Sequence, residues 1–101
     1  MNQTPQISKV SLSPHTADID ALVLSMVEKD KDMSCKLKIK VVSEYGPSTP
    51  PLPANSEIEI QIPKSVIENE KIKTGSNVLV RVSYYHTPMD ENNYWAFVKF
   101  N

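Results

Sequence analysis

Two stretches of strict alternation constrain the fold of this 101-residue chain more than any other feature. In CKLKIKVV (35–42) lysines separate the apolar residues, and SEIEIQI (56–62) alternates isoleucine with glutamate or glutamine. Because successive side chains of a strand point to opposite faces of a sheet, each stretch predicts a strand with one buried and one solvated face. The connection EYGPSTPPLPAN (44–55) joins them, so the pair predicts a hairpin with a proline-rich loop.

The register of this hairpin can be predicted if the two strands pair symmetrically about the loop. The polar row then sets Lys40 opposite Glu57, Lys38 opposite Glu59, and Lys36 opposite Gln61. The apolar row, in which Val41 also falls, sets Ile39 opposite Ile58, Leu37 opposite Ile60, and Cys35 opposite Ile62. A slip of one residue would place isoleucines against lysines, so the pattern disfavours it. Each charge pair contributes only about 0.2–1 kcal/mol, and the aliphatic row therefore holds the hairpin together.

The segments around the hairpin complete a mostly β chain. Residues Ala17–Lys29 have apolar residues at helical spacing but also read as a buried strand. We favour the strand, because the apolar block leads through the polar turn Glu28–Ser34 directly into the hairpin, as in a meander. Residues Pro63–Glu70 predict a short helical turn, and Thr74–Asn77, which contains Gly75, predicts a turn into the next strand.

The chain ends with a second predicted hairpin, from Val78 to Tyr84 or Tyr85 and from Tyr94 to Phe100, around a polar loop at His86–Asn93. The predicted core row pairs Val78 with Phe100, Val80 with Val98, Val82 with Ala96, and Tyr84 with Tyr94. The opposite face then carries Leu79, Arg81, Ser83, Tyr85, Trp95, Phe97 and Lys99. This register predicts an aromatic outer surface at the end of the chain.

Three meander strands, a short helix and a terminal hairpin follow one another in the order of the OB-fold, and over residues 17–100 the chain resembles that family. The resemblance implies an all-β, five-stranded Greek-key barrel with one short helix between strands 3 and 4. It also implies a binding module whose ligand surface lies on the second and third strands and the flanking loops. The alternative is an immunoglobulin-like β-sandwich with Ile7–Leu12 as its first strand, which requires about seven strands where at most six are found.

We expect a single β-barrel domain over residues 13–101, preceded by a flexible N-terminal segment or added edge strand at residues 1–12. No apolar run approaches the ~18 residues of a membrane span. We therefore expect a soluble protein, either cytoplasmic or exported with its signal removed. The net charge of −1 provides no general attraction to nucleic acid.

The sequence predicts neither an enzyme nor a cofactor or metal site. The single cysteine, Cys35, falls on the predicted core row and reads as a buried thiol. His15 precedes Asp18 and Asp20, and His86 precedes Asp90 and Glu91, but neither group has the spacing of a zinc motif. Two glycines in the whole chain exclude the common phosphate-binding loops.

The function expected is that of a non-enzymatic binding module for a protein or peptide. Its candidate binding residues are the aromatic β-face Tyr85, Trp95 and Phe97 with Arg81, and, as a possible second contact, Tyr45, Pro50, Pro51 and Pro53 of the proline connection. The prolines also read simply as a stiff loop that prevents edge pairing.

Two other functions stay open. Single-stranded nucleic acid would bind Lys36, Lys38 and Lys40 with nearby aromatics, although Glu57 and Glu59 oppose two of these lysines in the predicted register. The chain could also be a purely structural domain of a larger assembly.

Overall fold

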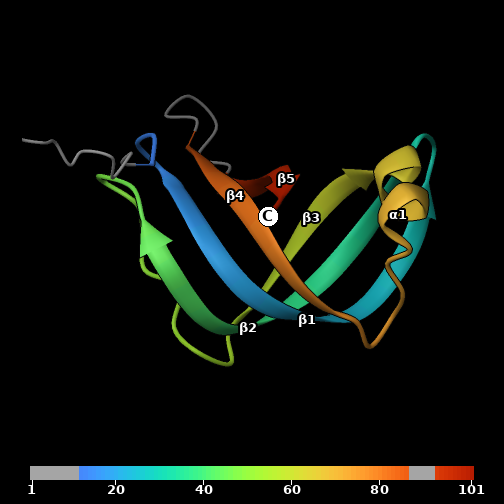
Figure 1. Ribbon diagram of the computed structural model, residues 1–101. Coiled ribbons are helices and arrows are strands. Elements are labelled where there is room, and N and C mark those ends of the chain that lie inside the picture. Colours follow the sequence, from blue (N-terminus) through green and yellow to red (C-terminus); the bar gives the residue numbers. More distant parts are fainter. Residues whose placement is uncertain (1–11, 87–92) are drawn as a thin grey trace, which may run out of the picture.

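Five antiparallel strands form one curved sheet in a computed structural model of the chain, which describes residues 12–86 and 93–101 (Figure 1). The elements are β1 (Thr16–Lys29), β2 (Asp32–Tyr45), β3 (Glu57–Pro63), α1 (Lys64–Glu70), β4 (Asn77–His86) and β5 (Asn93–Phe100). The sheet order is β3-β2-β1-β4-β5. The described strands all belong to this one sheet, so the sandwich alternative is wrong, whereas the all-β class is confirmed.

β1 lies at the centre of the sheet, where it pairs with β2 on one side and β4 on the other. Its buried apolar residues alternate with more exposed ones, and they are Ala17, Ile19, Ala21 and Val23. This period of two is that of a strand and not of a helix, which confirms the strand prediction for residues 17–29. The sheet curls around these small and branched side chains until its edge strands β3 and β5 approach each other (Figure 1).

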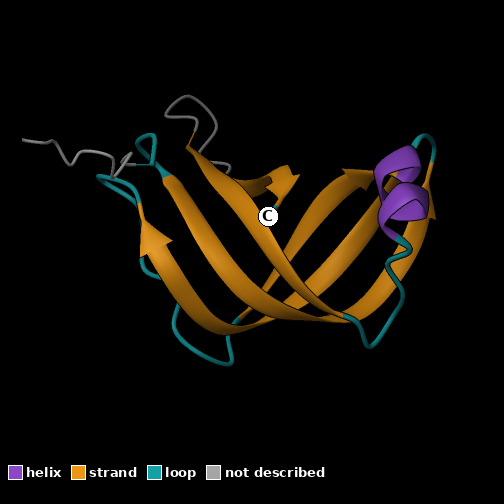
Figure 2. Cartoon of the chain, in the orientation of Figure 1, coloured by secondary structure: helices purple, strands orange, loops and turns teal. Residues whose placement is uncertain are grey.

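The core fills the inside of the curl. Besides the β1 residues, it contains Cys35, Leu37, Ile39, Ile60, Ile62, Val78, Val80 and Val82 from the other strands, Leu52 from the loop between β2 and β3, and Ile67 from α1. Apart from Val41, both rows of the first predicted hairpin thus face the predicted sides. α1 begins directly after Pro63, as predicted, and closes one end of the sheet with Ile67 (Figure 2).

The predicted register between β2 and β3 is wrong by two residues. Lys38 lies opposite Glu57 and Lys36 opposite Glu59, while Leu37 lies opposite Ile58. A shift of two keeps every side chain on its face, so the alternation could not distinguish the two registers. The hairpin is not symmetric about its loop. β2 pairs with β3 only as far as Lys38 but continues alongside β1 to Tyr45.

Val41 was predicted to lie in the core row but is 54% exposed. The β1–β2 register shifts between the pairs Ala21–Ile39 and Asp20–Val41, so Lys40 is an extra residue in β2. Such a bulge exchanges the two faces for the residues that follow it. Val42 consequently packs against the core in place of Val41.

The predicted N-terminal segment at residues 1–12 lies outside the described residues except for Leu12, which is buried. Among the described residues, the one helix has seven residues, and no helix has the length and hydropathy needed to cross a bilayer.

Candidate functional site

A cleft of about 550 Å³ opens at the end of the sheet where β1 begins. Figure 2 shows this end of the sheet on the side opposite α1. Three segments that are distant in the sequence line it: the turn before β1, the proline loop (residues 46–56, between β2 and β3), and the end of β4. The lining residues are Pro14, His15, Ser48, Pro50, Ser83, Tyr84, Tyr85 and His86.

The turn before β1 is fixed against the proline loop by backbone hydrogen bonds. His15, at φ 65°, donates its N–H to the carbonyl of Pro47 (2.9 Å), and Gly46 donates to the carbonyl of Thr16 (2.7 Å). Gly46 is buried, and a Cβ at this position would stand 2.0 Å from the carbonyl oxygen of Ser13. Only glycine allows this close approach of the two backbones.

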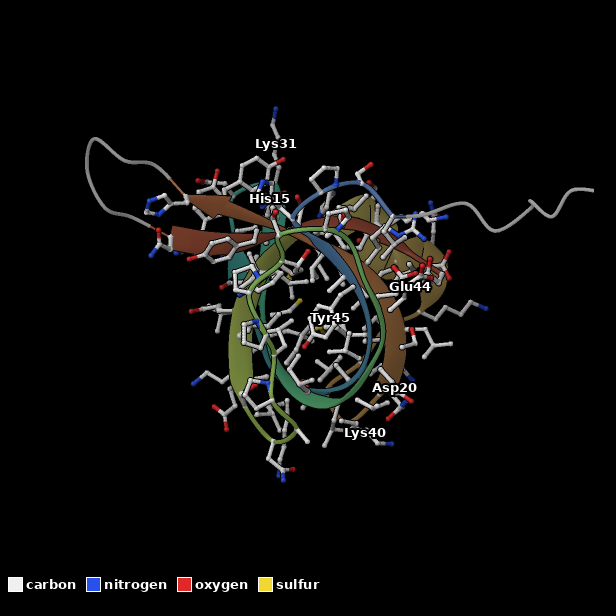
Figure 3. All side chains as sticks on the ribbon, turned by 90° about the vertical axis from the view of Figure 1, so that its left-hand side faces the viewer. His15, Asp20, Lys31, Lys40, Glu44 and Tyr45 are labelled. Carbon is white, nitrogen blue, oxygen red and sulfur yellow. The ribbon has the colours of Figure 1, made fainter. Side chains whose placement is uncertain are left out.

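The proline loop is anchored from within. The side chain of Leu52 is buried in the core, and its N–H donates to the hydroxyl of Tyr45 at 2.7 Å. Tyr45 points into the middle of the ring of strands in the view along this end of the sheet (Figure 3). The Thr49 hydroxyl donates to the carbonyl of Gly46 at 2.7 Å. Tyr45 therefore supports the loop that forms one wall of the cleft.

Of the predicted loop contacts, only Pro50 lines the cleft. Pro51 and Pro53 are exposed outside it. Ser48 has a φ of 59°, which interrupts the polyproline II conformation between Pro47 and Pro50. The loop is therefore better described as one wall of a site than as a proline-rich ligand.

The predicted aromatic face is split between the two sides of the sheet. Tyr85 stacks on Tyr94 with 5.2 Å between ring centroids, and these two rings are about half exposed. Trp95 and Phe97, in contrast, pack against the core, where Trp95 meets Tyr84 at 5.0 Å. The prediction that Trp95 and Phe97 share an outer face with Tyr85 is wrong.

A register shift between Arg81 and Val82 causes this difference. Val82 pairs with Phe97 and Tyr84 with Trp95, one residue away from the predicted pairs, whereas Val80 pairs with Phe100. A slip of one residue turns the side chains to the other face. The bulge leaves Val98 exposed and turns Phe97 and Phe100 inward together, where their centroids are 5.0 Å apart.

Arg81 stays on the outer face but is paired with a neighbouring strand. Its Nε and Nη2 donate to the two carboxylate oxygens of Asp18, at 2.7 and 3.0 Å. The hydrogen bond from Arg81 lowers the pKa of Asp18 below its ordinary value and raises the pKa of Arg81. A bidentate pair of this kind fixes two adjacent strands, so Arg81 contributes to the sheet and does not line the cleft.

The lysine row keeps its predicted face, and its charges are partly compensated. Glu59 and Glu57 lie opposite Lys36 and Lys38, and the Lys40 ammonium donates to the Asn77 side chain at 2.8 Å. The only aromatic residue in β2 and β3 is Tyr45, which supports the proline loop. Neither strand therefore supplies a further aromatic ring beside the lysines.

Two histidines contribute imidazole rings to the cleft. His15 Nδ1 lies 3.0 Å from the carbonyl oxygen of Ser48, and His86 Nδ1 contacts the Asn93 side-chain oxygen. Cys35 lies in the core, where burial raises the pKa of its thiol to about 11. Within residues 12–86 and 93–101, no three His, Cys, Asp or Glu side chains gather where they could hold a metal ion. Asp90 and Glu91, considered with His86 in the sequence, lie outside the described residues.

Sequence reasoning found Tyr85 and Pro50 but not the rest of the cleft. Tyr84 was predicted to be a core residue, and His15 and His86 were considered only as metal ligands. Pro14, two residues before β1, was a usable signal, because proline favours turns and interrupts strands. No known protein family matches the chain, and no curated protein is significantly similar to it.

Proposed function

We propose that this chain is a non-enzymatic binding module that takes a segment of another protein, or a peptide, in the cleft at the start of β1. The observation that carries the proposal is the composition and size of the cleft. Its volume of about 550 Å³ falls within the range of natural ligand sites, roughly 300–1,000 Å³. Tyrosine, proline and histidine supply most of its lining, and none of the lining residues is Asp, Glu, Lys or Arg.

The fold we propose for this module is the OB-type barrel. Three features support it: the sheet order β3-β2-β1-β4-β5, the helix between β3 and β4, and the approach of the two edge strands. Barrels of this type bind on the face of strands 2 and 3 and on the β1–β2 and β4–β5 loops, whereas the cleft of this chain is lined by the turn before β1, the β2–β3 loop and the end of β4.

Tyr85 is the residue expected to contribute most to binding. It is 49% exposed, and its ring is held by stacking on Tyr94. A tyrosine that is already ordered loses little conformational entropy when a partner covers it, which is one reason tyrosine is enriched at binding hot spots.

The test is a selection of random dodecapeptides displayed on phage against the immobilised chain, followed by affinity measurements on synthetic copies of the enriched peptides. We expect Tyr85→Ala to weaken binding by at least about tenfold. Leu79→Ala is the matched control, because Leu79 is an equally exposed apolar residue of the same strand outside the cleft, and we expect it to bind normally.

Two results would contradict the proposal. The first is the absence of any enriched peptide whose binding depends on Tyr85. The second is tight binding of an oligothymidylate at low salt that weakens steeply as salt is added, because this is the behaviour of a nucleic-acid site.

A further inference from the structure

β4 is longer than the strand beside it at the cleft. The last pair of the β1–β4 ladder joins Thr16 to Ser83, and β4 then continues to His86. The chain before Thr16 turns away at Pro14 and His15 towards the proline loop. The edge of β4 that faces β1 is thus left without a neighbouring strand over its last three residues, within the described part of the chain.

The hydrogen-bond pattern shows which backbone groups point to this edge. Tyr84 donates its N–H to the carbonyl of His15 at 2.7 Å, so Tyr84 is oriented towards β1. In an antiparallel sheet the N–H and C=O of one residue point to the same side, and alternate residues point the same way. The carbonyl of Tyr84 and both backbone groups of His86 therefore face the side of β1.

The described residues provide no backbone partner for these three groups on that side. The N–H of His15, which would complete the pair with Tyr84, donates to Pro47 instead. Ser13 would stand opposite His86 if β1 continued, but its carbonyl accepts a hydrogen bond from the Thr16 hydroxyl. The open edge of β4 consequently presents one donor, the N–H of His86, and two acceptors, the carbonyls of Tyr84 and His86. These groups have the spacing that an added strand requires.

The side chains around this edge agree with the backbone. Consecutive residues of a strand point to opposite faces, yet Tyr84 and Tyr85 both line the cleft. A cleft that touches both faces of one strand must run along the edge of that strand. Pro14 and Pro50, from the turn before β1 and from the proline loop, line the same cleft.

We propose that the bound peptide adds to the sheet as a short strand along the edge of β4 at Tyr84–His86, in line with β1. The inference rests on the proposed function and specifies its ligand as an extended segment, recognised through its backbone. Alternate side chains of that segment lie against Tyr85 on one face of the sheet and against Tyr84 on the other.

The first experiment compares two substitutions at one residue. His86→Ala and His86→Pro both remove the imidazole, but only the proline also removes the N–H that points to the open edge. For the peptides selected on phage, we expect His86→Pro to bind about 3- to 10-fold more weakly than His86→Ala, because one hydrogen bond is lost. Equal urea midpoints of the two variants establish that both are folded.

The second experiment uses the tightest of these peptides with each backbone nitrogen methylated in turn. Strand addition predicts that methylation weakens binding at alternate positions, since only every second N–H of the peptide points to β4. Equal affinity of all the methylated peptides, together with equal affinity of the two His86 variants, would overturn strand addition while peptide binding stands. The absence of any selected peptide would overturn both proposals.

Discussion

Replacing Gly46 by alanine should destabilise the fold by forcing the proline loop away from the turn before β1. Gly46 is buried where the proline loop crosses the turn before β1, and it donates its N–H to the carbonyl of Thr16. An added Cβ would stand 2.0 Å from the carbonyl oxygen of Ser13 and 3.2 Å from the Thr16 hydroxyl oxygen. The first contact is with backbone, so no side-chain rotation can relieve it, and the two segments must separate by more than 1 Å.

The expected cost follows from this contact. Forcing one extra methyl group into a well-packed site typically destabilises a protein by about 1–3 kcal/mol. We expect the upper half of this range, because the displacement also weakens the hydrogen bond from Gly46 to Thr16. With a urea dependence of roughly 1–3 kcal/mol per molar, the unfolding midpoint should fall by about 1 M.

Gly75→Ala is the matched control, since it adds the same methyl group to the other glycine of the chain. No atom lies within 4 Å of a Cβ at Gly75, but its φ is +92°. Alanine there should therefore cost about 1–2 kcal/mol through backbone strain, and asparagine, which tolerates positive φ, should cost less. At Gly46, asparagine should be worse than alanine. A Gly46→Ala midpoint equal to that of the parent chain would refute the close approach.

Three further predictions concern single side chains. Trp95→Ala should lower the free energy of unfolding by about 2 kcal/mol or more, since Trp95 packs on the core, whereas a change below about 0.5 kcal/mol in urea denaturation would place it on the outer face. Because Arg81 lowers the pKa of Asp18 below its ordinary value, the pair stabilises the fold at neutral pH, and this stabilisation is lost as the pH falls through the lowered pKa. The urea midpoint should therefore drop more between pH 7 and pH 3 in the parent than in Arg81→Gln, and equal drops would contradict the pairing. The Cys35 thiol, with a pKa raised to about 11, should not react with a chromogenic disulfide reagent at pH 8 until urea unfolds the chain, and fast reaction of the folded protein would show that it is accessible.

The sequence was sufficient to predict what alternation determines. The meander, the helical turn after Pro63, the turn at Gly75 and the buried Cys35 all depend on a period of two or on proline and glycine, and the structure confirms them. The register of the first hairpin was wrong by two residues because both registers bury the same isoleucines.

The alternation of apolar and polar residues could not predict the single-residue bulges. The extra residue Lys40 exposes Val41, and the shift after Arg81 turns Trp95 inward. Each bulge adds one residue to one strand without any proline or glycine to mark it, yet it exchanges the faces of the residues beyond it. The prediction of a single aromatic surface depended on the register between β4 and β5, and it was wrong because the bulge changes that register.

The central position of β1 has a consequence for how the chain reaches this structure. β1, β2 and β3 are consecutive in the sequence and can pair after closing short loops, but the ladder between β1 and β4 joins Thr16 to Ser83. Contacts this far apart in sequence are slow to form, and small all-β domains rich in them fold in milliseconds to seconds. We expect the β1–β4 ladder to form late, after the meander. The cleft, which needs the end of β4 beside the start of β1, would then be completed only in the last step, so that only fully folded chains present it to a partner.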